Sequence, residues 1–186
     1  MTPSISNGSA QAVPRNGPAV WRAATVFAAL AAFLLAAMPA RADQTLEVHA
    51  MMYSGPGLCV YGQAKLTRHD TANEEWNIGL YPEVTLGTFA NCTGASSTYT
   101  WKIMPTGWTS IGRQLWYSTG GPWTVCKDFG FATNGEPLAS QDLQVWNGLG
   151  PHPCGPGFYG LMGGFYAWDG HTWQGNWLWT GYLYSQ

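Results

Sequence analysis

Apolar and polar residues alternate in short runs along most of this chain. After Asp43 no segment repeats its apolar residues every three or four positions between helix-capping residues. The runs are rich in Val, Thr and aromatic residues, and Gly, Pro, Asn or Ser separates each from the next. This pattern predicts an all-β fold, a small antiparallel sandwich or barrel, with glycine in nearly every connection.

Two breaker residues divide the predicted strands further. Pro82 lacks the N–H that a central strand needs, and Gly112 weakens the interior of a strand. The prolines within 150–157 predict an irregular loop there. The strands expected from the pattern are 44–53, 59–66, 76–81, 84–90, 98–104, 108–111, 113–117, 123–125, 129–133, 143–146 and 158–162.

The clearest turn signal lies in the C-terminal stretch 165–184. Asp169-Gly170 suits a two-residue type I′ turn, because Asp tolerates positive φ and Gly adopts it at no steric cost. Such a turn would place Trp168 opposite His171. Alternation along the strands then predicts one shared face for Tyr166, Trp168, His171 and Trp173, continued by Trp177, Trp179 and Leu183.

The first residues have the pattern of an export signal rather than of a folded domain. Arg15 and Arg22 precede the apolar run 23–37, and Ala40-Arg41-Ala42 fits a small-x-small cleavage site. The alternative is a retained membrane anchor, but the run is short for a span and the cleavage site follows it directly. We therefore expect a signal peptide over 1–42, a secreted all-β domain over 43–186, and no stable membrane insertion after cleavage.

The charge of the expected mature domain excludes several partners. Residues 43–186 contain all ten acidic residues but only five of the eight basic ones, which gives a formal charge of −5. No basic cluster is present to contact a phosphate backbone, so we do not expect nucleic-acid binding. The same deficit argues against attraction to anionic lipid.

Four cysteines lie in the expected mature domain: Cys59, Cys92, Cys126 and Cys154. An even number in an exported chain predicts two disulfides, and three connectivities are possible. We favour Cys59–Cys92 with Cys126–Cys154, since each would close a loop of a few strands, although the sequence does not decide between the three. The spacings differ from the short paired spacings of zinc sites, so no metal site is expected.

The aromatic content is the unusual feature of the composition, with 11 Trp, 9 Tyr and 7 Phe. Trp and Tyr have flat apolar faces with a polar tip, which suit the apolar faces of sugar rings. The competing interpretation is that most of these rings fill the core of a domain poor in Leu and Ile. The candidate binding platform is Tyr166, Trp168, Trp173 and Trp177, with Asp169, His171 and Asn176 at its rim.

The search for catalytic motifs favours binding over catalysis. The chain has no nucleophile elbow, phosphate loop or zinc-protease motif, and no cofactor is expected. A glycosidase needs two carboxylates across a cleft, and the spacing favours no pair among Asp128, Glu136, Asp142 and Asp169. The predicted function is secreted, non-catalytic binding of a glycan or cell-wall polymer. The alternatives are a protein-directed effector, such as a hydrolase inhibitor or toxin acting through loop 150–157, and a hydrolase of unrecognised type.

Overall fold

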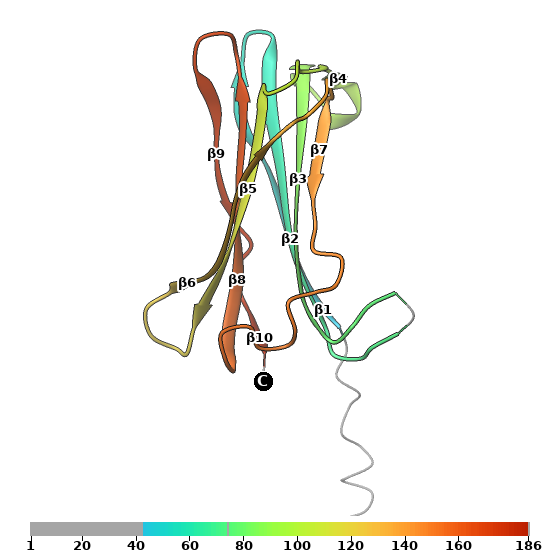
Figure 1. Ribbon diagram of the computed structural model, residues 1–186. Coiled ribbons are helices and arrows are strands. Elements are labelled where there is room, and N and C mark those ends of the chain that lie inside the picture. Colours follow the sequence, from blue (N-terminus) through green and yellow to red (C-terminus); the bar gives the residue numbers. More distant parts are fainter. Residues whose placement is uncertain (1–42, 74, 186) are drawn as a thin grey trace, which may run out of the picture. The chain divides into compact units, whose positions relative to one another are not determined.

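The computed structural model describes residues 43–73 and 75–185. The predicted signal peptide, 1–42, lies outside the described residues. The described chain is all-β, as predicted, and its strands form two antiparallel sheets that face each other (Figure 1). None of the described residues belongs to a helix long and apolar enough to span a membrane.

Each sheet has five strands. The first contains β1 (Gln44–Gly55), β2 (Leu58–His69), β3 (Gly79–Asn91), β4 (Thr100–Trp101) and β7 (Ser140–Leu143). The second contains β5 (Thr109–Ser118), β6 (Thr124–Thr133), β8 (Gly157–Trp168), β9 (Trp173–Trp179) and β10 (Leu183–Ser185). A single 3-10 turn, η1 (Ser96–Thr98), precedes β4 in the described chain.

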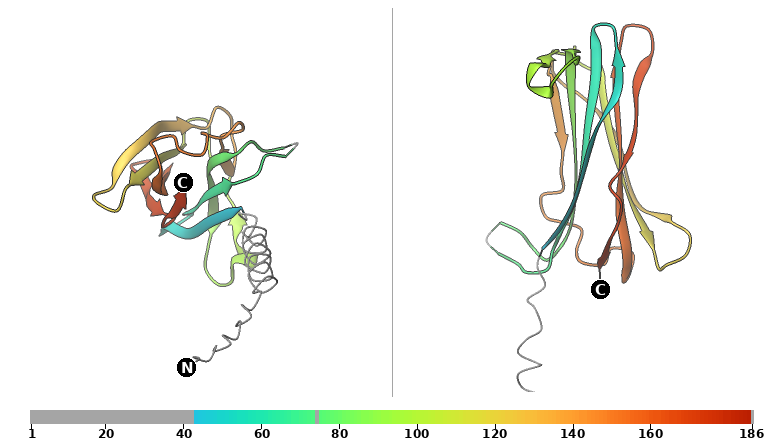
Figure 2. Two further views of the ribbon diagram at one scale, coloured as in Figure 1. Left: turned by 90° about the horizontal axis from the view of Figure 1, so that it is seen from below. Right: turned by 180° about the vertical axis from the view of Figure 1, so that it is seen from behind.

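The order of the strands follows from their pairing. In the first sheet β2 lies between β1 and β3, while β4 and β7 pair with the far edge of β3. In the second sheet β5 lies between β6 and β8, while β9 and β10 share the far edge of β8. The turns of the β1–β2 and β8–β9 hairpins lie at the same end of the two sheets, as Figures 1 and 2 both show.

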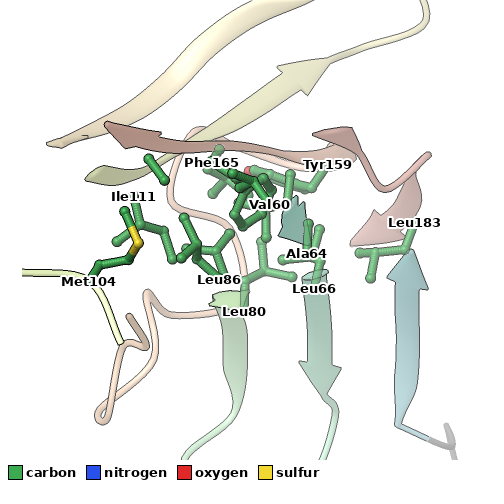
Figure 3. Close-up of a cluster of buried hydrophobic side chains, with 14 of the residues drawn as sticks. Val60, Ala64, Leu66, Leu80, Leu86, Met104, Ile111, Tyr159, Phe165 and Leu183 are labelled. Carbon is green, nitrogen blue, oxygen red and sulfur yellow. The ribbon is translucent and has the colours of Figure 1, made fainter. Parts of the chain in front are cut away.

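The core lies between the sheets and is built from aliphatic side chains and two aromatic rings, Tyr159 and Phe165 (Figure 3). Phe165 fits because glycine lies across from it: a Cβ on Gly62 of β2 would be 2.5 Å from its Cδ2 atom. The expectation that tryptophan fills the interior is wrong. Every tryptophan of the described chain is at least partly exposed, since Leu, Val and Ile supply the core.

Four predicted strand breaks are wrong: β3 runs through Pro82, β5 through Gly112, β6 through 126–128 and β8 through 163–164. The Leu80 N–H points away from β2 and donates to the Gly150 oxygen at 3.2 Å. Alternate residues point the same way, so the Pro82 nitrogen faces that edge too, where β7 pairs only with 84–87. The predicted strand 98–104 is also wrong, since only β4 forms there.

The β8–β9 hairpin has a four-residue connection rather than the predicted two-residue turn. Trp168 lies opposite Trp173, not opposite His171. The Asp169 carboxylate accepts hydrogen bonds from the His171 and Thr172 N–H groups at 2.7 and 2.8 Å, which stabilises the wider loop. Because the register moves by two residues, the shared face of Trp168 and Trp173 is retained.

The predicted face ends before Leu183, which is a further correction. The chain leaves the β8 edge after Trp179 and returns as β10, where Leu183 pairs with the core residue Tyr159. Leu183 is therefore buried between the sheets rather than exposed beside Trp179.

Both favoured disulfides are confirmed, Cys59–Cys92 and Cys126–Cys154. The first joins β2 to the segment that follows β3, and the second joins β6 to the long loop before β8. Disulfides of this kind are typical of oxidising compartments.

Candidate functional site

The outer face of the second sheet carries the aromatic residues singled out by the sequence. Residues 159, 161, 165 and 167 of β8 point into the core, so the alternate residues point outward. Trp168 lies opposite Trp173, and Gly164 lies opposite Trp177. The Trp168 and Trp173 rings meet edge to face, with centroids 5.8 Å apart. The structure thus brings Tyr166, Trp168, Trp173 and Trp177 onto one surface.

A further ring, Phe131 of β6, joins this surface from two strands away. Its centroid lies 5.3 Å from that of Trp177 and 5.9 Å from that of Tyr166. Phe131 can reach them because the two intervening residues are glycines. A Cβ on Gly112 would be 2.7 Å from Phe131 Cδ1, and one on Gly164 would be 2.9 Å from Phe131 Cζ.

Trp108 extends the same surface at the hairpin end of the sheet. The Trp168 N–H donates to the Trp108 oxygen at 2.8 Å, next to the pairing of Thr109 with Ala167. This register places Trp108 beside Trp168 on the outer face. We define the hairpin platform as Trp108, Phe131, Tyr166, Trp168, Trp173 and Trp177.

The three rim residues take different roles. The Asp169 carboxylate is occupied within the turn, because it accepts from two backbone N–H groups and, at 2.8 Å, from Gln174 Nε2. These hydrogen bonds lower the pKa of Asp169 to about 2, and the one from the Thr172 N–H has the largest effect on the pKa. His171 is exposed at the tip of the turn. Asn176 lies opposite Phe165, and its Oδ1 accepts from the Trp177 N–H at 2.8 Å.

The same outer face has a hollow farther from the hairpin turn. Its volume is about 330 Å³. We call it the indole hollow, and its lining residues are Trp116, Trp123, Met162, Trp179 and Tyr182. The Trp123 ring stands nearly perpendicular to Trp179, with centroids 5.2 Å apart. The centroid of the Tyr182 ring lies 5.9 Å from that of Trp123.

The outer face of the first sheet has a more polar pocket of about 250 Å³. His69 Nδ1 lies 2.7 Å from Asp43 Oδ2, and the His69 ring stacks on Trp76 with centroids 5.2 Å apart. The hydrogen bond with His69 is the largest cause that lowers the pKa of Asp43. Lys65 Nζ and Glu83 form an ion pair of 2.9 Å in the wall.

The two alternative functions rest on loop 150–157 and on the candidate carboxylates. Loop 150–157 lies against the sheet, because Tyr159 Oη, Tyr117 Oη and Ser185 Oγ donate to its carbonyl oxygens at 2.5, 2.9 and 2.7 Å. The carboxylates considered for a hydrolase lie apart: Asp128 belongs to the second sheet and Asp142 to the first. Burial raises the pKa of Asp142, which accepts from Thr85 at 3.1 Å. Over 43–73 and 75–185, no group of three His, Cys, Asp or Glu side chains is placed to hold a metal.

Comparison with known proteins returns no relative. No family model, curated protein or solved structure matches the chain.

The sequence could not have indicated Phe131 and Trp108 as members of the platform. Phe131 lies on β6 and Trp108 directly precedes β5, both far from the hairpin in sequence, and they join it only because β5 lies between β6 and β8. The alternation of each strand is readable from the sequence, but the order of strands in a sheet is not.

Proposed function

We propose that this protein is a secreted binding protein that recognises a glycan or cell-wall polymer through the hairpin platform. The observation that carries the proposal is the exposure of large rings on one ordered sheet face: Phe131 is 51% exposed, Trp173 45% and Trp108 37%. Soluble monomers rarely leave contiguous apolar surface of this kind uncovered unless it binds something.

The chemistry of the platform suits a neutral, ring-containing ligand. Indole and phenyl faces pack against the C–H faces of pyranose rings, while nearby hydroxyls can bond to sugar hydroxyls. Ser110 lies opposite both Tyr166 and Thr133, so the register places two hydroxyl groups among the rings. All of the rings except Trp108, which directly precedes β5, are held by strands, and this rigidity lowers the ordering cost of binding.

Successive rows of the platform also suit an extended ligand. Outward residues of one strand recur every second position, roughly 6.6–6.8 Å apart. Trp168, Tyr166 and Gly164 of β8 mark three such rows, and a ring from a neighbouring strand covers Gly164. A polymer of repeating sugar rings would meet several aromatic faces at once, which multiplies weak contacts.

The protein-directed and hydrolytic alternatives have less support. An inhibitory loop needs free backbone groups to offer its target, whereas carbonyl oxygens at Pro151, Gly155 and Pro156 already accept hydrogen bonds from the protein's own side chains. Paired acid catalysis needs two carboxyls across one cleft. Asp128 and Asp142 lie in different sheets, and Asp169 is occupied in its turn.

The test is co-sedimentation with insoluble cellulose, chitin and peptidoglycan, together with affinity electrophoresis in soluble glucans. Trp173→Ala and Trp108→Ala should each weaken binding about tenfold, as for a well-placed aromatic contact. Trp146→Ala is the matched control, because Trp146 is 70% exposed but lies after β7, off the platform. The proposal is overturned if the wild type binds no polysaccharide, or if the control loses as much binding as the platform variants.

A further inference from the structure

We infer that the indole hollow is a site for a quaternary ammonium group, of the kind found in choline. This inference does not depend on glycan binding by the hairpin platform. The hollow draws its walls from distant parts of the chain: Trp116 from β5, Trp123 from the loop before β6, and Trp179 from the end of β9. Met162 and Tyr182 complete the lining.

The rings around the hollow face in more than one direction. Trp123 is inclined by 79° to Trp179 and by 44° to Tyr182. Trp179 lies over Gly160, where any Cβ would collide with the indole, so glycine gives this ring its place. Walls at several angles can contact the methyl groups of a rounded cation on more than one side.

The lining is poor in groups that fix sugar hydroxyls. It contains no carboxylate, side-chain amide or ammonium group. The Trp116 Nε1 atom is buried and lacks a hydrogen-bond partner in the described chain, so a ligand cannot reach it from the surface. A sugar would find few side-chain partners for its hydroxyls there. A trimethylammonium group has no N–H to satisfy, and the faces of Trp and Tyr attract it electrostatically.

The surrounding charge favours a cation over a neutral group of the same shape. Gln114 pairs with both Met162 and Asp128, and its Nε2 donates to Asp128 Oδ2 at 3.0 Å. Asp128 therefore lies on the same face as the hollow, two strand spacings or about 10 Å from Met162. Within the described chain, the register places no arginine or lysine on this face. Lys127 lies opposite the core residue Leu115, with its ammonium 5.5 Å from the Phe129 ring.

The substitution state of the nitrogen also matters. A primary ammonium keeps a strong hydration shell and needs hydrogen-bond acceptors when it leaves water. The hollow offers one phenolic oxygen, on Tyr182, among its side chains. A methylated nitrogen loses less on entering such a lining, because its methyl groups contact the rings directly.

Titration with choline chloride, followed by tryptophan fluorescence and calorimetry, tests the inference. The neutral isostere 3,3-dimethyl-1-butanol has the same shape without the charge. We expect choline to bind at least tenfold more tightly than the isostere, and Asp128→Asn to weaken choline binding several-fold at low salt. Equal affinity for the two ligands would overturn the inference, as would the absence of choline binding by the folded wild type.

Variants locate the site and separate it from the platform. Trp179→Leu and Trp123→Leu should each lose choline binding while retaining a cooperative thermal transition, and Trp173→Ala should retain it. Retention of choline binding in both leucine variants overturns the assignment.

Co-sedimentation with phosphatidylcholine vesicles, compared with phosphatidylglycerol vesicles, identifies the source of the quaternary ammonium group. Binding to the former indicates a lipid headgroup, and binding of free choline alone indicates a soluble or polymer-attached ligand.

Discussion

Gly62→Ala should destabilise the protein, because the added methyl group has nowhere to go. Gly62 lies on β2, directly across the core from Phe165. Its Cβ would be 2.5 Å from Phe165 Cδ2 and 2.7 Å from Cγ, well inside contact distance. Phe165 is fully buried, so its ring cannot swing into solvent to relieve the clash. Overpacking of this type costs about 1–3 kcal/mol of unfolding free energy.

Gly112→Ala is the matched control, with the same added methyl group and a similar nominal clash. Its Cβ would be 2.7 Å from Phe131 Cδ1. Phe131, however, is 51% exposed and can tilt outward. Replacing glycine also restricts the unfolded chain, which favours folding by about 0.4–1 kcal/mol. We therefore expect Gly112→Ala to lie within about 0.5 kcal/mol of the wild type.

Urea unfolding under non-reducing conditions measures both changes from the midpoint at an unchanged slope. Thermal melting should show Gly62→Ala lower by roughly 2–4 °C for each kcal/mol lost, as for a domain of this size. The reasoning is refuted if the two variants lose equal stability, or if Gly62→Ala is as stable as the wild type. Gly112→Ala should nevertheless weaken glycan binding, because it displaces a platform ring.

Three further predictions concern the turn, a buried cation and the disulfides. Because the pKa of Asp169 is lowered, its contribution to stability is complete above about pH 4 and is lost as the pH falls toward 2. Asp169→Asn keeps an acceptor oxygen but does not titrate, so its melting temperature should depend less on pH over that range than that of the wild type. Parallel curves for the two proteins would contradict this prediction. Arg113 is 8% exposed, and its Nε and Nη1 atoms lack hydrogen-bond partners in the described chain. Urea unfolding of Arg113→Met should therefore give a free energy of unfolding between that of the wild type and a value about 2 kcal/mol higher. The disulfides close loops of similar length, with sequence separations of 33 and 28, so alanine replacement of either pair should cost a similar amount, about 3.5–4 kcal/mol by the chain-entropy relation; a large inequality in urea unfolding would show that strain or residual structure dominates.

The fold class and the presence of two disulfides could be predicted from the sequence, whereas the choice among the three connectivities could not, because each bridge joins residues far apart in the chain. Alternation marks each strand, and an even number of cysteines in an exported chain predicts pairing. Strand breaks were harder to predict. Pro82 is tolerated because its nitrogen faces a part of the β3 edge with which no strand pairs, and that edge is defined only once β7 is placed.

The hairpin shows how a short-range signal can compete with another. Asp-Gly fits a type I′ turn, which would need positive φ at Asp169. The described chain has no positive φ outside glycine, and only Gly170 supplies one in this turn. The Asp169 side chain instead accepts two backbone N–H groups, and this hydrogen bonding favours the four-residue loop. The shared face of Trp168 and Trp173 is retained because the register differs from the predicted one by two residues, whereas His171 lies in the turn and Leu183 in the core.

The exposed rings could serve to cover the backbone of the sheet or to bind a ligand, and the glycines of β8 help to distinguish these two roles. Trp179 packs over Gly160, and Phe131 and Trp177 pack over Gly164, so these rings cover strand backbone that has no side chain of its own. Their position on the sheet therefore has a structural reason, since aromatic rings packed over strand glycines stabilise the sheet.

Trp108 and Trp173 differ from these rings, because neither is among the nearest neighbours of a Cβ built on a glycine of the described chain. Trp173 packs edge to face on Trp168, yet it remains 45% exposed, and Trp108 is 37% exposed. Binding should consequently be more sensitive to Trp173→Ala and Trp108→Ala than stability is, whereas Trp177→Ala should reduce both. A platform whose every ring affected stability and binding in the same proportion would be a cover for the sheet and not a recognition surface.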